Sequence, residues 1–312
     1  MALYLVTGGA GFIGSHLVRT LLERGDTVRV LDNFLSGRHA NLVGIEKDID
    51  LHIGSVVDPD VVQTAMQGVD YVLHQAAIAS VVRSVDNPYE SHEVNATGTL
   101  NVLTAARDAQ VKKVVFAASC AAYGDDPTLP KGENMPLQAC SPYAATKITG
   151  EYYCQAFTKV YGLPTIALRY FNVFGPRQDP ASLYAAVIPR FVTRMLKDES
   201  PLIYGDGLQS RDFVYVGDIV RANLLACAAP SQADGQVMNI GSGVAYTLLD
   251  VVAAINTLLG TEISPKHGPP SPGDIRHSLA DISRAKTLID YTPTRSLTEG
   301  LQRIIESIST TI

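Results

Sequence analysis

The sequence predicts an α/β protein. We expect a Rossmann-type parallel sheet with helices on both faces, plus a smaller mixed C-terminal part. Apolar, strand-like runs alternate with helical segments through the first 171 residues. A glycine-rich turn follows the first strand, and proline- and glycine-rich connections appear after about residue 171. Alternating strands and helices are typical of a parallel sheet, because parallel neighbours need a crossover connection between them.

The elements of the first part follow from their apolar patterns. Short apolar runs predict strands at residues 2–7, 27–31, 51–53, 71–75, 113–118 and 164–170. Apolar residues at helical spacing predict helices at residues 12–24, 94–109 and 142–161, with a further helical stretch between the third and fourth strands. The last of these helices begins at a proline, which suits the first helical turn. Crossovers between parallel strands should be right-handed.

After about residue 171 the regular alternation of strands and helices ends. The stretches FGPRQDPAS and HGPPSPGD are rich in proline and glycine, and helices are predicted at residues 187–196, 217–229 and 247–259. We divide the chain into residues 1–171 and 172–312. Some segments of the second part are expected to return to the first domain.

Composition excludes several classes of protein. The 312 residues carry a net charge of −6 and no long basic run, which argues against nucleic acid or an anionic membrane as partner. The four cysteines lack C-x-x-C spacing and the seven histidines lack an H-x-x-x-H pair, so we predict neither a disulfide framework nor a metal site. We find no basic leader and no apolar run of about 18 residues, and therefore expect a cytoplasmic protein.

The turn VTGGAGFIGSH points to a dinucleotide. Gly8 would allow the tight turn, Gly11 would let the backbone approach a pyrophosphate, and Gly14 would let helix and strand pack closely. The helix that follows would offer free N–H groups to the phosphates. The alternative is an ordinary glycine-rich connection.

Asp32 ends the second predicted strand. A carboxylate there accepts hydrogen bonds from an adenosine ribose and repels a 2′-phosphate, which favours NAD over NADP. Arg38 lies near enough in sequence to weaken this inference, and Asp32 as a simple turn residue is the alternative.

Ser119, Tyr143 and Lys147 form the candidate catalytic set. Ser119 ends a buried strand, and Tyr143 and Lys147 share a helix face at spacing i, i+4. An ammonium about 6 Å from the phenol would favour phenolate by roughly 3 kcal/mol at an effective dielectric of ~20. That corresponds to about two pKa units, so Lys147 would make Tyr143 a usable base and Ser119 would hydrogen-bond the reacting oxygen. A surface pair is the alternative reading of the two helical residues.

The chain resembles the extended short-chain dehydrogenase/reductase family along nearly its whole length. The segments TGGAGFIGSH, HQAA, NATGT, SPYAATK, LRYFNVFGPRQ and SRDFVYVGDI are similar to those of nucleotide-sugar 4-epimerases. The resemblance implies tightly bound NAD and a homodimer formed through a four-helix bundle, with helices near residues 90–109 and 143–161. The expected cofactor contacts are Gly8, Gly11, Phe12, Ile13, Asp32, Asn33, Ser55, Val56, Gln75, Ala76, Ala77, Tyr143, Lys147 and Tyr170.

The resemblance also implies a reaction. Tyr143 takes the proton of the 4-hydroxyl while C4 gives hydride to NAD⁺, the 4-keto sugar turns over, and hydride returns to its other face. Related dehydratases and decarboxylases carry acidic residues after the catalytic Ser or Thr, where this chain has Cys120 and Ala121. The expected substrate contacts are Ser80, Ser119, Tyr143, Asn172, Gln178, Ala186, Val187, Tyr204, Arg211, Asp274 and Ser278.

The resemblance implies that the stretch SPGDIRHS contributes to diphosphate binding and to the choice of sugar. Many relatives place an arginine where this chain has Ser271, and Arg276 is a possible replacement. Ser278 matches a position that is bulky in epimerases restricted to UDP-glucose and UDP-galactose, so a small residue implies room for the 2-N-acetyl group of UDP-GlcNAc and UDP-GalNAc. The alternatives are an epimerase confined to UDP-glucose and UDP-galactose, a UDP-glucuronate 4-epimerase, and a non-catalytic NAD-sensing regulator.

Overall fold

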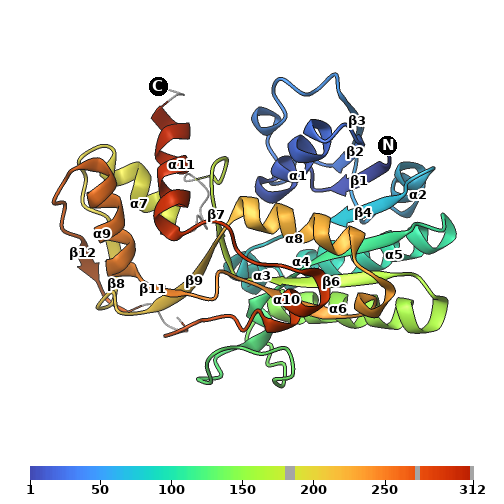
Figure 1. Cartoon of the computed structure of the whole chain (residues 1–312). Coiled ribbons are helices and arrows are strands. Elements are labelled where there is room, and N and C mark those ends of the chain that lie inside the picture. The colour runs from blue at the N-terminus through green and yellow to red at the C-terminus, as the bar shows by residue number, and fades with distance from the viewer. Residues whose placement is uncertain (180–186, 271–274, 310–312) are drawn as a thin grey trace.

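A seven-stranded parallel sheet forms the centre of the computed structural model, which describes residues 1–179, 187–270 and 275–309 (Figure 1). The strand order is β10-β6-β5-β4-β1-β2-β3. The strands are β1 (Leu3–Thr7), β2 (Thr27–Asp32), β3 (Ile49–Ile53), β4 (Tyr71–His74), β5 (Lys113–Ser119), β6 (Thr165–Tyr170) and β10 (Val237–Ile240). All six neighbouring pairs are parallel. The predicted Rossmann-type fold is confirmed.

Helices cover both faces of this sheet because its strands send alternate side chains to opposite sides. Tyr4 and Val6 of β1 belong to one buried cluster, and Leu5 belongs to the other. The first face is covered by α1 (Phe12–Glu23), α8 (Val216–Ala228) and α10 (Ser283–Ile289). The second is covered by α2 (Pro59–Met66), α5 (Gly98–Asp108) and α6 (Pro142–Tyr161).

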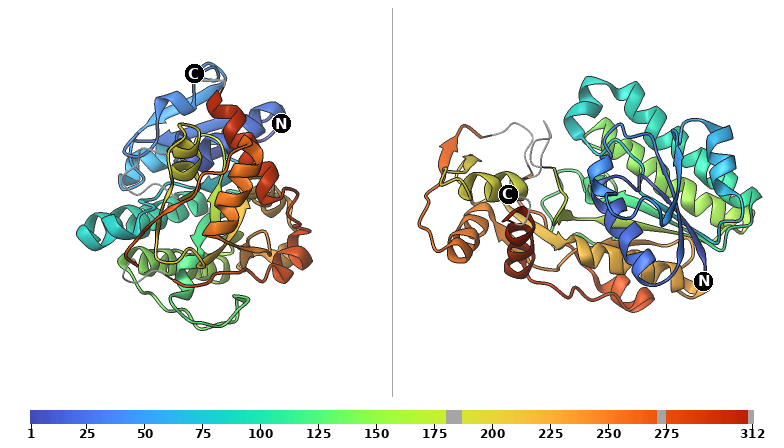
Figure 2. Two further views of the ribbon diagram at one scale, coloured as in Figure 1. Left: turned by 90° about the vertical axis from the view of Figure 1, so that its left-hand side faces the viewer. Right: turned by 90° about the horizontal axis from the view of Figure 1, so that it is seen from above.

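The smaller part lies beside the carboxyl ends of the large sheet and has its own core (Figures 1 and 2). Its strands are β7 (Asn172–Phe174), β9 (Ser210–Tyr215) and β11 (Ala245–Thr247) in one sheet, and β8 (Leu202–Tyr204) and β12 (Lys266–Gly268) in another. Its helices are α7 (Val187–Met195), α9 (Leu248–Leu259) and α11 (Leu297–Ser309). The three-stranded sheet is mixed, since β9 pairs parallel with β7 and antiparallel with β11.

Several elements differ from the sequence prediction. The helix expected at residues 94–109 begins as a π-helical turn, Glu93–Thr97, before α5. Buried Asn95 lies in this turn, and its amide bonds both backbone groups of Ile78. Strand β10 and two short helices, α3 (Val81–Asp86) and α4 (Pro88–His92), were not predicted. The division into two domains stays a prediction, although β10 and α10 both pack into the first part.

The described part of the chain shows neither a membrane-spanning helix nor a cluster of metal-binding side chains. Within residues 1–179, 187–270 and 275–309, none of the helices combines the length and the apolar character that crossing a bilayer requires. Across the same ranges, we find no group of three or more His, Cys, Asp or Glu side chains placed to hold a metal ion.

Candidate functional site

The glycine turn lies between β1 and α1. Gly8 has φ +69°, a left-handed conformation that glycine adopts without strain, and a Cβ there would lie 2.8 Å from the backbone nitrogen of Ala76. A Cβ on Gly14 would lie 2.1 Å from the carbonyl oxygen of Gly8. Gly11 is the N-cap of α1 and contributes no side-chain hydrogen bond. The first N–H groups of α1 are therefore available to a phosphate-bearing ligand.

Asp32 holds the loop on the other side of this turn. Its buried carboxylate accepts hydrogen bonds from the backbone N–H of Ala10 (2.9 Å) and of Phe34 (2.8 Å). Burial raises the pKa of Asp32, and these two hydrogen bonds oppose the shift. Arg38 turns toward Asp179, with 3.2 Å between guanidinium and carboxylate. A ribose hydroxyl beside Asp32 would therefore meet a fixed carboxylate, and Arg38 is already ion-paired with Asp179.

One cavity brings together every residue predicted to bind the cofactor. It runs from the glycine turn past Asp32 to Tyr143 and Lys147, along the carboxyl ends of β1, β2, β4, β5 and β6. This is where nucleotides bind to open parallel sheets, at the point where the strand order reverses. The glycine cradle, the uncapped helix and the carboxylate fit NAD, although contact between each residue and NAD stays a prediction.

The same cavity has walls that sequence reasoning missed. They are Leu31, Leu35, Ser36, Gly37, Gly54, Ile78, Ala79, Val94, Ala117 and Ala118. Gly37 could have been found from the sequence, because a glycine shortly after Asp32 indicates that the backbone passes close to the carboxylate. A Cβ at this position would lie 2.8 Å from both carboxylate oxygens of Asp32. Val94 could not have been found in this way, because the π-helical turn that places it in the cavity wall cannot be predicted from hydrophobic periodicity.

The three catalytic candidates converge at the end of β5. Tyr143 lies in the first turn of α6, whose N-cap Ser141 accepts a hydrogen bond from the N–H of Ala144. A hydrogen bond joins the side chains of Tyr143 and Ser119. Lys147 donates to the carbonyl of Ala117 (2.9 Å), and its ammonium lies 6.0 Å from the centre of the Tyr143 ring. The structure thus brings together the three side chains that the sequence predicted to act as one set, while their catalytic roles stay a prediction.

The electrostatics differ from the sequence estimate. Burial raises the pKa of Tyr143 to about 12, and the hydrogen bond with Ser119 opposes this rise. Burial also lowers the pKa of Lys147 to about 8, while nearby Glu151 raises it. The protein groups alone do not bring the pKa of the phenol toward neutrality, because desolvation outweighs the Ser119 hydrogen bond that opposes it. A further positive charge, such as that of an oxidised nicotinamide, would favour the phenolate.

A second cavity brings together four of the predicted substrate residues, Asn172, Val187, Tyr204 and Arg211. It lies in the smaller part and is also lined by Val173, Phe174, Ile188, Arg190, Phe191, Leu202, Gln209, Phe213 and Leu248. Its aromatic and arginine side chains suit a base attached to phosphate groups, since a flat ring packs on aromatics and a guanidinium pairs with phosphate.

Other predicted substrate residues lie outside this cavity wall. Ser80 caps α3, accepting a hydrogen bond from the N–H of Arg83. Gln178 donates to the carbonyl of Val173. Ser278 is buried, and its N–H donates to the carbonyl of Ser210 (3.0 Å).

Three predicted positions, Ala186, Ser271 and Asp274, lie outside the described residues. Arg276, considered as a replacement for the missing phosphate-binding arginine, makes a two-pronged ion pair with Asp206 at 2.8 and 2.7 Å. This pair holds the pKa of Asp206 at about 2, mainly through its hydrogen bonds.

Comparison with known proteins identifies the family. A sequence model described as the NAD dependent epimerase/dehydratase family matches residues 4–241. The chain belongs to this family. NAD is therefore its cofactor, and the glycine cradle with Asp32 is the part of the fold that fits it.

Three solved structures of epimerases are similar to the chain. The UDP-N-acetylglucosamine 4-epimerase of Methanobrevibacter ruminantium, in complex with UDP-N-acetylmuramic acid, is 40% identical with a TM-score of 0.95, covering 100% of this chain and 99% of that one. The UDP-glucose 4-epimerase of Thermotoga maritima, with UDP-glucose, is 39% identical with a TM-score of 0.94, covering 99% of each. The UDP-glucuronic acid 4-epimerase of Bacillus cereus, with UDP-glucuronic acid and NAD, is 31% identical with a TM-score of 0.90, covering 99% and 100%.

Proposed function

We propose that this chain is a UDP-sugar 4-epimerase that interconverts UDP-GlcNAc and UDP-GalNAc and also accepts UDP-glucose and UDP-galactose. The observation that carries this proposal is that Tyr143 and Lys147 line one end of the cofactor cavity, with Ser119 hydrogen-bonded to Tyr143, while the second cavity, which Arg211 lines, lies in the smaller part. The three similar epimerases act on different UDP-sugars, so the choice among sugars rests on Ser278.

The roles of the residues follow from their positions. Tyr143 removes and returns the proton of the sugar 4-hydroxyl, Ser119 hydrogen-bonds the same oxygen, and Lys147 supplies positive charge beneath the phenol. The residues of the cofactor cavity would hold NAD, which would supply a hydride acceptor and donor for the sugar. Arg211 and Asn172 hold the diphosphate, and Tyr204 and Val187 pack against the base. An anchored nucleotide leaves the sugar free to present either face.

Dehydration and decarboxylation are less well supported. Both reactions are carried out in related enzymes by acidic residues directly after the catalytic hydroxyl. Here Cys120 stands in that place, and burial, with a smaller contribution from Asp212, raises the pKa of its thiol to about 12. A neutral thiol does not replace a carboxylate as a proton carrier near neutral pH.

A panel of UDP-sugars tests the proposal. UDP-GlcNAc, UDP-glucose and UDP-glucuronic acid are incubated separately with the NAD-loaded enzyme, and the 4-epimers are resolved by chromatography. We expect interconversion of UDP-GlcNAc and UDP-glucose but not of UDP-glucuronic acid. Turnover of UDP-glucose alone would leave the simpler galactose epimerase, and bound NAD with no turnover of any sugar would favour the non-catalytic regulator.

We also propose a homodimer formed through the helices on the α5 and α6 side. Large apolar side chains are exposed on this side, from α3, α4 and α6: Val81, Val82, Val85, Tyr89 and Tyr152. Exposed apolar surface of this kind marks protein contact sites. Light scattering coupled to gel filtration measures the mass, and a monomer at micromolar concentration would contradict the proposal. The cytoplasmic location stays a prediction.

A further inference from the structure

A buried carboxylate lies one helical turn beyond Lys147. Glu151 of α6 is 1% exposed, and residues 143, 147 and 151 share one face of the helix because they are four apart. Its two oxygens accept hydrogen bonds from Arg169 of β6, at 2.8 Å from Nε and 2.7 Å from Nη2. Burying a carboxylate is costly unless it is paired, so this ion pair needs a reason beyond packing.

We propose that Glu151 is a positioning residue for catalysis: it keeps Lys147 in its cationic form beneath Tyr143, so that the phenol of Tyr143 is the group that gives up its proton. The inference deepens the proposed function and rests on it, because it concerns the same base.

Among the groups around Lys147, Glu151 is the one that favours the cationic form of its side chain. Lys147 donates to the Ala117 carbonyl and lies 5.1 Å from the centre of the Phe116 ring, both on β5. His74 of β4 is neutral, because burial and the charge of Lys147 lower its pKa to about 3. Within the described residues, Glu151 is the carboxylate whose charge acts on Lys147. The other titratable groups around this pair are Arg169 and four buried groups whose pKa values are raised mainly by burial: Tyr143, Cys120, Cys154 and Tyr123.

The proton balance of the pair explains why a carboxylate is needed. Burial lowers the pKa of Lys147 to about 8 and raises that of Tyr143 to about 12. By these effects alone the first proton to leave comes from Lys147, which gives a neutral amine beside a neutral phenol. Phenolate with ammonium has the same number of protons, so nearby charges decide between the two forms. The charge of an oxidised nicotinamide would favour phenolate but disfavour ammonium, whereas Glu151 favours ammonium.

Arg169 holds the carboxylate of Glu151 in place through two hydrogen bonds. Its third nitrogen, Nη1, donates to the hydroxyl of Tyr123 (2.9 Å), which in turn donates to Oδ1 of Asn239 (2.6 Å). Arg169 also pairs in register with Ala118, next to Ala117, whose carbonyl binds Lys147. Glu151 is therefore paired with Arg169 of β6 and lies one helical turn from Lys147 on α6.

The test is Glu151→Gln, which removes the charge and keeps the shape. An ultraviolet difference titration of the NAD-loaded enzyme reports phenolate, and the signal missing from Tyr143→Phe belongs to Tyr143. Near pH 8, where Lys147 titrates, we expect the Tyr143 phenolate fraction to fall about tenfold, with a similar fall in kcat and little change in KM. Asp50→Asn is the control, because Asp50 pairs with Arg29 at the far edge of the sheet.

The outcomes separate this inference from the proposed function. An unchanged phenolate signal in Glu151→Gln, together with a lowered one in Lys147→Ala, overturns the role of Glu151 and leaves the epimerase standing. A signal unchanged in both variants removes Lys147 from the mechanism. If Glu151→Gln fails to fold, Glu151→Asp can be used in its place, because it keeps the carboxylate but moves it about one methylene further from Lys147. We expect an intermediate phenolate fraction in that variant, and the wild-type fraction would overturn the inference.

Discussion

The cofactor cavity and the substrate cavity differ in how directly the sequence encodes them. All the residues predicted to bind NAD line the first cavity, whereas only four of the predicted substrate residues line the second. The first cavity is built from strand ends, each of which follows a readable apolar run. The second is built from short mixed strands and from α7, which meet only through tertiary packing. A site built at the ends of regular strands, such as the cofactor cavity, can thus be predicted from the sequence. The substrate cavity, which depends on loops and short strands, is harder to predict and determines specificity.

The largest effect should come from the chemical end of the cofactor cavity. Tyr143→Phe removes only the ionisable oxygen, so we expect kcat to fall by about a thousandfold, within the range of general base catalysis. Affinity for NAD and for UDP-sugar, measured by calorimetry, should change little. A Phe variant that retains more than a tenth of the wild-type kcat would remove Tyr143 from the base role.

A smaller loss is expected at Lys147. Lys147→Ala removes the ammonium that lies 6.0 Å from the Tyr143 ring, so the pKa of Tyr143 should rise further above about 12. A smaller fraction of phenolate then exists at any given pH. We therefore expect kcat at neutral pH to fall by about a hundredfold and the pH optimum to move upward. A pH–rate profile of unchanged shape would contradict the electrostatic role.

The substrate side is tested by Ser278→Tyr. The Ser278 side chain is buried, and overpacking a close-packed site typically costs ~1–3 kcal/mol. We expect kcat/KM for UDP-GlcNAc to fall roughly ten- to a hundredfold while UDP-glucose is spared, because only the acetamide needs that volume. Equal losses on both sugars would indicate general damage to this loop, and no loss on UDP-GlcNAc would place the specificity elsewhere.

The smallest effect concerns the choice between NAD and NADP. Asp32→Ala removes the carboxylate that would repel a 2′-phosphate, so the preference for NAD over NADP should narrow by about tenfold. Arg38 stays engaged with Asp179, which limits the gain for NADP. Calorimetric titration with both cofactors measures the ratio, and the surface variant Asp48→Ala serves as the control. Equal binding of both cofactors by the wild-type enzyme would refute the assignment of Asp32.

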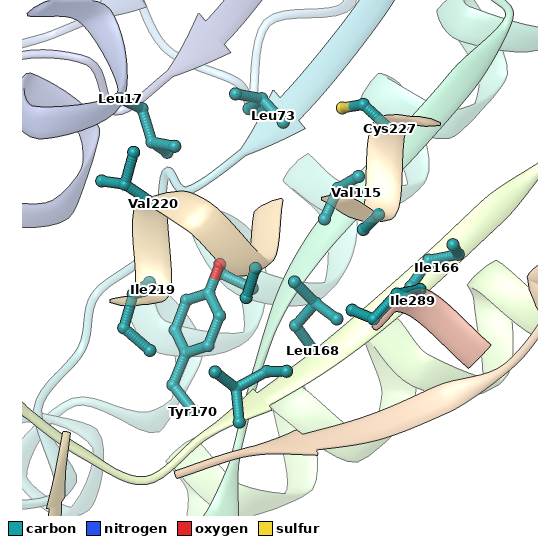
Figure 3. Packing of buried hydrophobic residues seen from close by; sticks show 14 of the residues in the cluster. Leu17, Leu73, Val115, Ile166, Leu168, Tyr170, Ile219, Val220, Cys227 and Ile289 are labelled. Atoms are coloured by element: carbon teal, nitrogen blue, oxygen red, sulfur yellow. The ribbon is translucent and has the colours of Figure 1, made fainter. Parts of the chain in front are cut away.

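The fold was largely predictable because the strands of a parallel sheet are buried on both faces and read as apolar runs. Figure 3 shows the buried cluster on one of these faces. The placement of Asp32, Tyr143 and Lys147 in the cofactor cavity was predictable because it depends on strand ends and helical spacing. The π-helical turn at Glu93–Thr97 was not, since the bonds of Asn95 to Ile78 that accompany it are tertiary. The raised pKa of Tyr143 was also not predictable, because desolvation of the phenol depends on tertiary packing.

Another feature missed by the sequence was the cluster at Tyr170. Figure 3 shows its ring among Leu168 of β6 and Ile219 and Val220 of α8. Its hydroxyl exchanges hydrogen bonds with Gln75 and with Asn223 of α8, a residue that no local motif connects with the cofactor cavity.

Strand β10 has a consequence for how the protein is made. It supplies the outermost strand of the large sheet, pairing from Val237 with Ala167 to Ile240 with Tyr170. During synthesis, β6 therefore emerges long before its outer neighbour and presents unpaired N–H and C=O groups in the interval. Such an open edge invites pairing with other nascent chains. A fragment ending at residue 171 would keep the glycine turn and the catalytic tyrosine, yet we expect it to aggregate.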